Sequence, residues 1–475
     1  MLTYDVKIWG IRKRPDRATP FQLRWRVGTT PHSKSYKIKE QADGRRSELL
    51  AALRNREQFD ETTGVPASEF HRLQSPTWYA HACAYAKMKW PTASAKHRAG
   101  IAEALATITP VLVKDSRGGP KQQALRTALY SWAFRFNRDD VTGELKPRQE
   151  TESAPADIAA ALEWITRKSV DAAELDKPTH LRAALGALSI KLDGTKAAET
   201  TVHRKYTVFT NALRYAVERE ILASFPLGKV DWKPPETDDE IDFRFVPSPG
   251  QAQRLIAAVR EQGPRGEHLA AFFGCLYYAA MRPAEVAALG DDACRLPPAP
   301  KNGTAESQWG ELVLSESRPE VGSGWTDDGV SYDKRGLKRR ARKATRPVPI
   351  PPVLVGMLRA HRATYGTAPD GRFFRASGGG RVRSTEYTGI WKAARSKALS
   401  AEDGMTPLAE VPYSLRHAGV SLWLSSGVDP VEVARRAGHS VAVLFRFYAK
   451  VIKGRQDQDN DRISRALAEQ AEYPE

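Results

Sequence analysis

A largely apolar run, Leu269–Met281, places the strongest limit on how this 475-residue chain can fold. A helix built from these residues has no polar side to turn toward water, so it must be covered by protein on all sides. The run falls short of the ~20 residues that span a bilayer, so it predicts a buried helix and no membrane insertion. The N-terminal segment also lacks the apolar core of a signal peptide, and we expect a cytoplasmic protein.

The overall charge favours a polyanionic partner. The chain has 73 Lys and Arg against 56 Asp and Glu, a net charge of +17. An excess of this size is typical of nucleic-acid-binding proteins, although it can also serve solubility alone. Cys83, Cys275 and Cys294 are too few and too far apart for a disulfide framework or a zinc site. The length predicts two to four domains.

The first 65 residues are predicted to form a small basic module. Thr3–Trp9, Phe21–Val27 and Ser35–Lys39 alternate in side-chain character, which predicts three short strands, with a helix after them. Arg24 and Arg26 share one face because strand side chains repeat every second residue. Such a face fits a DNA groove, and a plainly solvated face is the competing interpretation. The candidate DNA-binding residues here are Arg12, Lys13, Arg14, Arg24 and Arg26.

A helical domain is expected over residues 66–235. Its last helix has one apolar stripe, formed by Val202, Tyr206, Phe209, Leu213 and Ala216. Basic residues lie off that stripe, and Arg204 and Lys205 are candidate DNA contacts.

A linker is expected where prolines and acidic residues follow, at residues 234–240. Ser248–Gln251 then starts a new helix, because it combines a capping serine, a proline in the first turn and a glutamine. We therefore expect a further domain over residues 243–453 and a tail over 454–475.

Five chemically distinctive features lie in this domain. Arg282 follows the apolar run directly, and an ion pair with Glu285 would be its ordinary structural role. Residues 331–346 then carry eight basic side chains, Lys338 and Lys343 among them, between two strand-like segments. Tyr413–His417 contains Arg416, Gly438–His439 ends the next helix, and Tyr448 follows. Arg416 and His439 are 23 residues apart, and Tyr448 comes nine residues later.

This ordered set resembles the catalytic signature of the tyrosine recombinases, the phage integrase family. The chain looks most like the long integrases of actinobacterial phages and integrative elements. The resemblance implies a multidomain, mainly α fold with small β-sheets: a three-stranded arm-binding module (1–65), a helical core-binding domain (66–235) and a mixed α+β catalytic domain (243–453). It also implies DNA integration and excision without a metal, another cofactor or ATP.

The resemblance assigns a role to each residue of the set. Two guanidiniums, Arg282 and Arg416, would hold the charge that gathers on an attacked phosphodiester. Tyr448 would be the nucleophile and form a 3′-phosphotyrosine. Lys338, or failing that Lys343, would protonate the 5′ oxygen that leaves. His439 would donate a hydrogen bond to the scissile phosphate.

Tyr413 departs from the family pattern, which has histidine at this position. Tyrosine titrates near pH ~10 and histidine near ~6.5, so Tyr413 is a poor general base at neutral pH. Either Tyr413 only positions the phosphate, or His417 and the surrounding water take over proton removal.

The expected partners are double-stranded DNA attachment sites near the nucleoid, other copies of the chain in a homotetramer, and a directionality factor. A helix-like stretch at residues 462–471 would dock on a neighbouring protomer. Two alternatives remain open: a catalytically inactive DNA-binding protein on the same scaffold, and a metal-dependent nuclease or transposase. No carboxylate cluster stands out to hold two metals for the latter.

Overall fold

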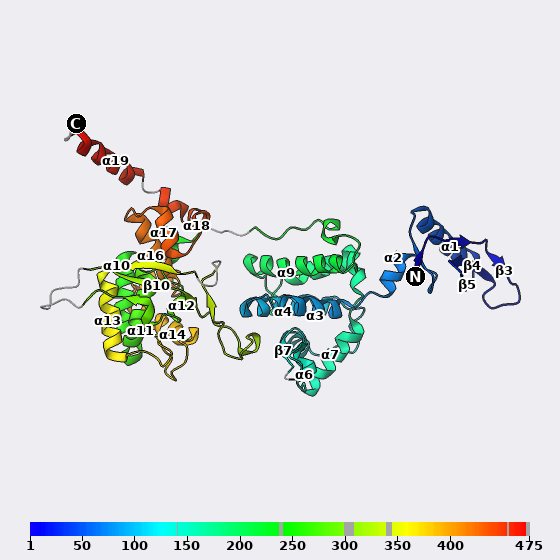
Figure 1. Ribbon diagram of the computed structural model, residues 1–475, viewed down its shortest axis with the longest axis horizontal. Helices are drawn as coiled ribbons and strands as arrows, with labels where there is room; N and C mark the ends of the chain where they lie inside the picture. Colours follow the sequence, from blue (N-terminus) through cyan, green and yellow to red (C-terminus); the bar gives the residue numbers. More distant parts are fainter. Residues whose placement is uncertain (140, 237–240, 299–307, 339–343, 454–455, 472–475) are drawn as a thin grey trace. The chain divides into compact units, whose positions relative to one another are not determined.

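The computed structural model describes residues 1–139, 141–236, 241–298, 308–338, 344–453 and 456–471. Residue contacts divide the chain into two units, Met1–Glu236 and Thr237–Glu475. Helices predominate and the sheets are small, which confirms the expected class (Figure 1). The expected linker at 234–240 lies largely outside the described residues. Within the described part of the chain, no helix is long and apolar enough to cross a membrane.

The N-terminal sheet is built around one central strand, β4 (Phe21–Val27). One edge of β4 pairs along its whole length with β5 (Thr30–Tyr36). The other edge pairs with β2 (Val6–Ile8) and with β3 (Arg12–Lys13). These two short strands follow one another along the same edge of β4, so the four strands occupy three positions in the sheet. The expected strand at Ser35–Lys39 begins earlier, because β4 turns directly into β5 at Gly28, whose φ is +54°.

One face of this sheet is buried. Leu23, Trp25 and Val27 are buried against Leu49 of helix α1 (Lys39–Arg54), while Arg24 between them is exposed. The remaining elements before the helical part are β1 (Leu2–Thr3), which pairs with β6 (Phe59–Asp60), and α2 (Ala67–Leu73). The alternation read from the sequence therefore describes a real two-faced sheet.

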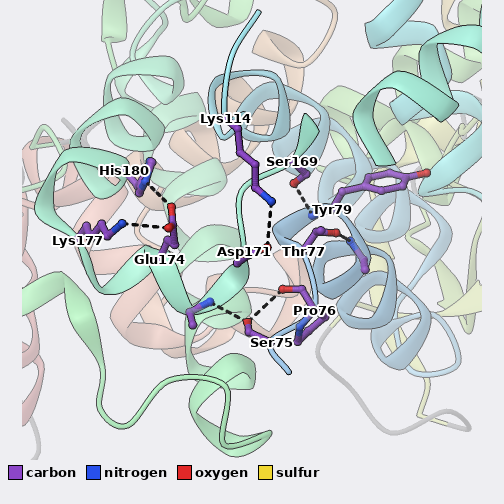
Figure 2. A network of polar contacts seen from close by, with 12 residues as sticks. Ser75, Pro76, Thr77, Tyr79, Lys114, Ser169, Asp171, Glu174, Lys177 and His180 are labelled. Carbon is purple, nitrogen blue, oxygen red and sulfur yellow. Dashed lines mark hydrogen bonds and ion pairs between the residues drawn. The ribbon is translucent and has the colours of Figure 1, made fainter. Parts of the chain in front are cut away.

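The helical part of the first unit consists of α3 (Trp78–Lys89), α4 (Ala95–Ile108), α5 (Gln122–Ala128), α6 (Arg148–Thr151), α7 (Ala156–Lys168), α8 (Pro178–Leu188) and α9 (Glu199–Glu218), with one hairpin, β7 (Phe136–Arg138) and β8 (Leu145–Pro147). Side-chain hydrogen bonds fix the start of α3, because its first backbone N–H groups have no partner within the helix. The Thr77 Oγ1 accepts from the Ala80 N–H at 3.2 Å, and the Ser169 Oγ from the Tyr79 N–H at 3.0 Å (Figure 2).

Helix α9 carries the apolar stripe expected of it, except that Tyr206 is only half-buried and Lys205 is buried. Val202, Phe209, Leu213 and Ala216 are buried and Arg204 is exposed, as predicted. Lys205, expected on the outer face, is buried instead. Its amine lies 3.1 Å from the Thr107 hydroxyl and 3.3 Å from Glu103, and these partners compensate for the lost water.

The second unit surrounds helix α11 (Gly263–Tyr278), which contains most of the apolar run and is buried as predicted. It packs against α10 (Pro249–Arg260), α13 (Pro352–Tyr365) and α16 (Ser414–Ser425) (Figure 1). Ser248 and Gln251 form the predicted capping box at the start of α10.

The second unit also contains a three-stranded sheet, a two-stranded hairpin and several further helices. The main sheet has the order β13 (Arg346–Ile350), β10 (Gly310–Leu314) and β9 (Cys294–Arg295), and a hairpin joins β11 (Glu316–Ser317) to β12 (Arg335–Gly336). The helices are α12 (Pro283–Val286), α14 (Ser384–Ala398), α15 (Ala401–Met405), α17 (Pro430–Ala437), α18 (Val441–Lys453) and α19 (Gln456–Ala471). Helix α19 includes the expected tail helix at residues 462–471.

Candidate active site

A cavity of about 480 Å³ in the second unit brings together residues that are far apart in sequence. Five of the six predicted catalytic residues line it: Arg282, Lys338, Tyr413, His439 and Tyr448. Its other lining residues are Ile241, His417, Gly438, Val443 and Phe447. Arg416 is fully buried behind this lining, and Lys343 lies outside the described residues.

Arg282 is held at the start of α12 by an ion pair. The chain leaves α11, and Pro283 starts the short helix α12 with Arg282 as its N-cap. Its guanidinium donates to Glu285 Oε1 at 2.9 Å and to the Gly438 carbonyl at 3.0 Å. The ion pair with Glu285, proposed as the ordinary role of this arginine, is therefore present. It also fixes Arg282 at the cavity wall.

Glu285 is shared by a second arginine, Arg346 of β13. The two guanidinium nitrogens of Arg346 lie 3.1 and 2.7 Å from the two carboxylate oxygens, and both side chains are about 1% exposed. Burial alone would raise the pKa of Glu285, but the charges of Arg346, Arg282 and Arg416 lower it to about 2. The carboxylate is therefore ionised at neutral pH and aligns two arginines.

Arg416 holds His439 in a defined orientation. Its guanidinium donates to the carbonyls of Ala280 and Ala437 and to His439 Nε2, the last at 2.8 Å. Because a guanidinium can only donate, Nε2 is the acceptor and the neutral ring carries its proton on Nδ1. Burial, together with the neighbouring arginines, lowers the pKa of His439 to about 3.

The Nδ1–H of His439 is a buried donor with no partner among the described residues. An unpaired buried donor of this kind costs stability unless something else accepts from it. Its ring lines the cavity beside Arg282. The wall of the cavity therefore carries the permanent cation of Arg282 and the neutral ring of His439, whose buried Nδ1–H is unpaired among the described residues.

Tyr448 lies at a break in helix α18. Its backbone, with φ −120° and ψ 20°, departs from helical values, and the side chain is fully buried. The hydroxyl lies 2.9 Å from His417 Nδ1. Burial raises the pKa of this hydroxyl well above its usual value, and the charges of Arg416 and Arg282 oppose that rise.

Lys338 follows strand β12 and is exposed at the cavity. The hairpin that carries it is fixed to the domain through Arg318, whose side chain contacts Glu316 at 2.5 Å and Asp370 at 2.8 Å. The Arg318 backbone N–H also donates to the Ala284 carbonyl in α12 at 2.8 Å. These contacts connect the lysine-bearing hairpin to α12, the helix whose N-cap is Arg282.

Gly438 can accept no side chain where it stands, which gives a first prediction. Its φ is +66°, and a Cβ would lie 2.2 Å from the Arg346 guanidinium. We expect Gly438→Ala to lower the free energy of unfolding by about 1–3 kcal/mol or more, measured by urea denaturation. Gly371→Ala is the matched control, since Gly371 has a φ of +79° with open space around it. Equal losses in the two variants would show that the Arg346 contact is unimportant.

The candidate DNA-binding residues of the first unit lie in different settings. In the register of the sheet, Arg12 is opposite Gln22 and so shares the face of Arg24 and Arg26, on which Gln22 is buried, whereas Lys13 is opposite Phe21 on the other face. Arg26 contacts Asp5 at 3.3 Å. Arg14 is half-buried. In helix α9, Arg204 pairs with Glu103 at 3.0 Å.

Sequence reasoning did not give Arg346 a role. The sequence did contain one indication of its burial. Arg346 alternates with Val348 and Ile350, so it lies on the face of β13 that points into the core. In the described part of the chain, no group of three or more His, Cys, Asp or Glu is placed to hold a metal ion.

Neither a family model nor a curated protein sequence matches this chain. Several solved structures are similar to it. One is the Tn1549 transposon integrase in complex with transposon right end DNA, with 15% identity, a TM-score of 0.45, and coverage of 66% of this chain and 96% of that one. The XerH site-specific recombinase bound to difH substrate shows 10% identity and a TM-score of 0.43, with 80% and 94% covered. The lambda integrase bound to DNA shows 10% identity and a TM-score of 0.37, with 61% and 86% covered.

Proposed function

We propose that this protein is a site-specific DNA recombinase that cuts and rejoins duplex DNA through Tyr448. The observation that carries the proposal is the shared cavity, in which a tyrosine hydroxyl lies among Arg282, His439 and Lys338. A phenolic oxygen, a permanent cation and two further proton donors are the groups that phosphodiester transfer to tyrosine requires.

Each residue has a defined task in the cleavage step. The Tyr448 oxygen attacks the scissile phosphorus and forms a 3′-phosphotyrosine, and the bond to the 5′ oxygen breaks. Arg282 and the His439 Nδ1–H donate to the non-bridging oxygens, which gain charge in the transition state. Arg416 keeps His439 in its donor tautomer. Lys338 protonates the 5′ oxygen as it leaves.

The order of the parts supports a role in moving an integrative element. Residues 243–453 would be the catalytic domain, 66–235 the core-binding domain and 1–65 the arm-binding module. Because the phosphotyrosine conserves the energy of the broken bond, rejoining needs no ATP. A homotetramer on two paired sites would exchange four strands, and a directionality factor would select excision.

Covalent trapping tests the proposal. Duplexes covering the repeats that flank the coding region are nicked just beyond the crossover point, so that the short fragment bearing the free 5′ hydroxyl diffuses away and the adduct persists. We expect the wild-type protein to form an adduct that resists denaturation. Salt-dependent binding without any adduct would instead support the inactive DNA-binding protein. Cleavage abolished by EDTA would support the metal-dependent alternative.

The arm-binding role rests on the exposed face of the N-terminal sheet, and β3 offers a matched pair of variants for testing it. Arg12→Ala removes a cation from the face that Arg24 and Arg26 share, and Lys13→Ala removes one from the opposite face. We expect Arg12→Ala to weaken binding to arm-site DNA by about 1 kcal/mol or more and to lower the salt dependence, with Lys13→Ala close to wild type. Equal effects in titrations would contradict the assignment of this face.

A further inference from the structure

The only hydrogen bond that the structure gives the Tyr448 hydroxyl within the described residues is to His417. The distance from Oη to His417 Nδ1 is 2.9 Å, and the two side chains come from the packed helices α18 and α16. Both residues line the cavity that holds the candidate active site. A group that accepts the tyrosine proton must be within hydrogen-bond reach of it, and His417 meets that condition.

Tyr413, which occupies the position where the family has histidine, lies beside this pair. Its ring meets the ring of His417 edge to face, with centroids 5.0 Å apart. The hydroxyl of a phenol cannot take up a further proton in neutral water. An imidazole can, provided that it is neutral beforehand.

The surroundings of His417 keep its ring neutral. Burial, with the charge of the adjacent Arg416, lowers the pKa of His417 to about 4. The titratable and charged groups around the same cavity are Arg282, Lys338, Tyr413, His439 and Tyr448. None of these side chains is a carboxylate, and a carboxylate would have stabilised a charged imidazole before the reaction.

We propose that His417 is the general base that removes the proton from Tyr448, in place of the residue at position 413. The inference rests on the function proposed above. As the phenolic oxygen forms its bond to phosphorus, its proton passes to His417 Nδ1, and the ring becomes an imidazolium. The electron pair of the broken bond remains on the 5′ oxygen, which takes a proton from the Lys338 ammonium.

The reverse reaction uses the same groups in opposite roles. The 5′ hydroxyl of the incoming strand attacks the phosphotyrosine and gives its proton to the neutral Lys338 amine. The His417 imidazolium returns a proton to the Tyr448 oxygen as that oxygen leaves. Both groups end in their starting states, so a full cycle of cleavage and rejoining has no net proton cost.

Two variants test the base. His417→Asn places an amide oxygen near the position of Nδ1 but cannot take a proton, and His417→Gln places the amide farther out. We expect both to bind DNA as the wild type does and to form the adduct on the order of 10²–10⁴-fold more slowly. Their rates should rise steadily with pH, because hydroxide must then remove the proton. Tyr413→Phe should lose less activity than either of them.

A more acidic nucleophile distinguishes a base from a residue with a merely structural role, because it should restore the reaction rate only where a base has been lost. A fluorinated tyrosine placed at position 448 ionises more readily and depends less on a base. We expect it to restore most of the rate lost in His417→Asn at a pH where its hydroxyl is ionised.

Three results bear on the inference, and they can be told apart from failure of the function itself. Adduct formation by His417→Asn at the wild-type rate would overturn it. The inference would also be overturned if the fluorinated tyrosine restored the rate of Tyr413→Phe but not the rate of His417→Asn. Absence of any adduct with the wild-type protein would instead refute the recombinase function on which the inference rests.

Discussion

Replacing Tyr448 by phenylalanine is expected to abolish the covalent adduct while the domain stays folded. The variant keeps the buried ring and loses only the hydroxyl oxygen that is proposed to attack phosphorus. Cleavage should fall by on the order of 10⁴-fold or more, because phenylalanine has no oxygen that could form the proposed link to phosphorus. The lost hydrogen bond to His417 should cost only about 1 kcal/mol of stability. Adduct formation is measured by gel mobility under denaturing conditions.

Tyr277→Phe is the matched control for this variant. Tyr277 lies in α11 and is also buried, and its hydroxyl has no hydrogen-bond partner within the described residues. Removing that oxygen should therefore leave both stability and adduct formation unchanged. An equal amount of adduct from the Tyr448→Phe and wild-type proteins would show that the nucleophile is another residue.

Replacing Glu285 by glutamine is expected to cause the largest loss of stability. The change leaves Arg346 buried without its counter-charge and turns an amide N–H₂ group toward two guanidiniums, which can only donate. Breaking a buried pair by changing one partner costs about 3–5 kcal/mol, and we expect a loss of that size in urea denaturation. Glu261→Gln is the control, because Glu261 and Lys397 form an exposed pair that contributes about 0–1 kcal/mol. A loss below about 1 kcal/mol for Glu285→Gln would contradict the proposed importance of the pair.

The same carboxylate predicts part of the acid sensitivity of the protein. The pKa of Glu285 is lowered in the folded state to about 2 from an ordinary value of 4.5. A group with a lowered pKa contributes stability that is fully present above its unfolded value and is lost as the pH falls toward the folded value. Wild-type stability should therefore fall between about pH 4.5 and 2 more steeply than that of Glu285→Gln. Parallel curves for the two proteins would contradict this.

Several features of the fold could be read from the sequence because they depend on local chemistry. The capping box at Ser248 and the apolar run in α11 both involve neighbours along the chain. The alternation in Phe21–Val27 likewise predicted the two faces of β4, except that Gln22 on the polar face is buried. Lys205 was misplaced because its burial depends on Glu103 and Thr107, about 100 residues away, and no helical periodicity reports such partners.

The candidate site could also be predicted only in part from the sequence, namely where it depends on the order and spacing of residues along the chain. Order and spacing selected residues that the fold brings to one cavity, with Arg416 placed behind its wall. The sharing of Glu285 by two arginines was not visible, because Arg346 is 61 residues away on another element. The contact between His417 and Tyr448 was equally hidden, since it depends on how α16 packs on α18.

Identifying the residue in the trapped adduct tests the central proposal most directly. The adduct formed by the wild-type protein on a nicked attachment-site duplex is digested with protease and nuclease, and the modified peptide is sequenced by mass spectrometry. We predict a nucleotide joined through its 3′ phosphate to the hydroxyl of Tyr448, together with a free 5′ hydroxyl on the released strand. Attachment to a different residue, or cleaved ends bearing a 5′ phosphate and a 3′ hydroxyl, would contradict it.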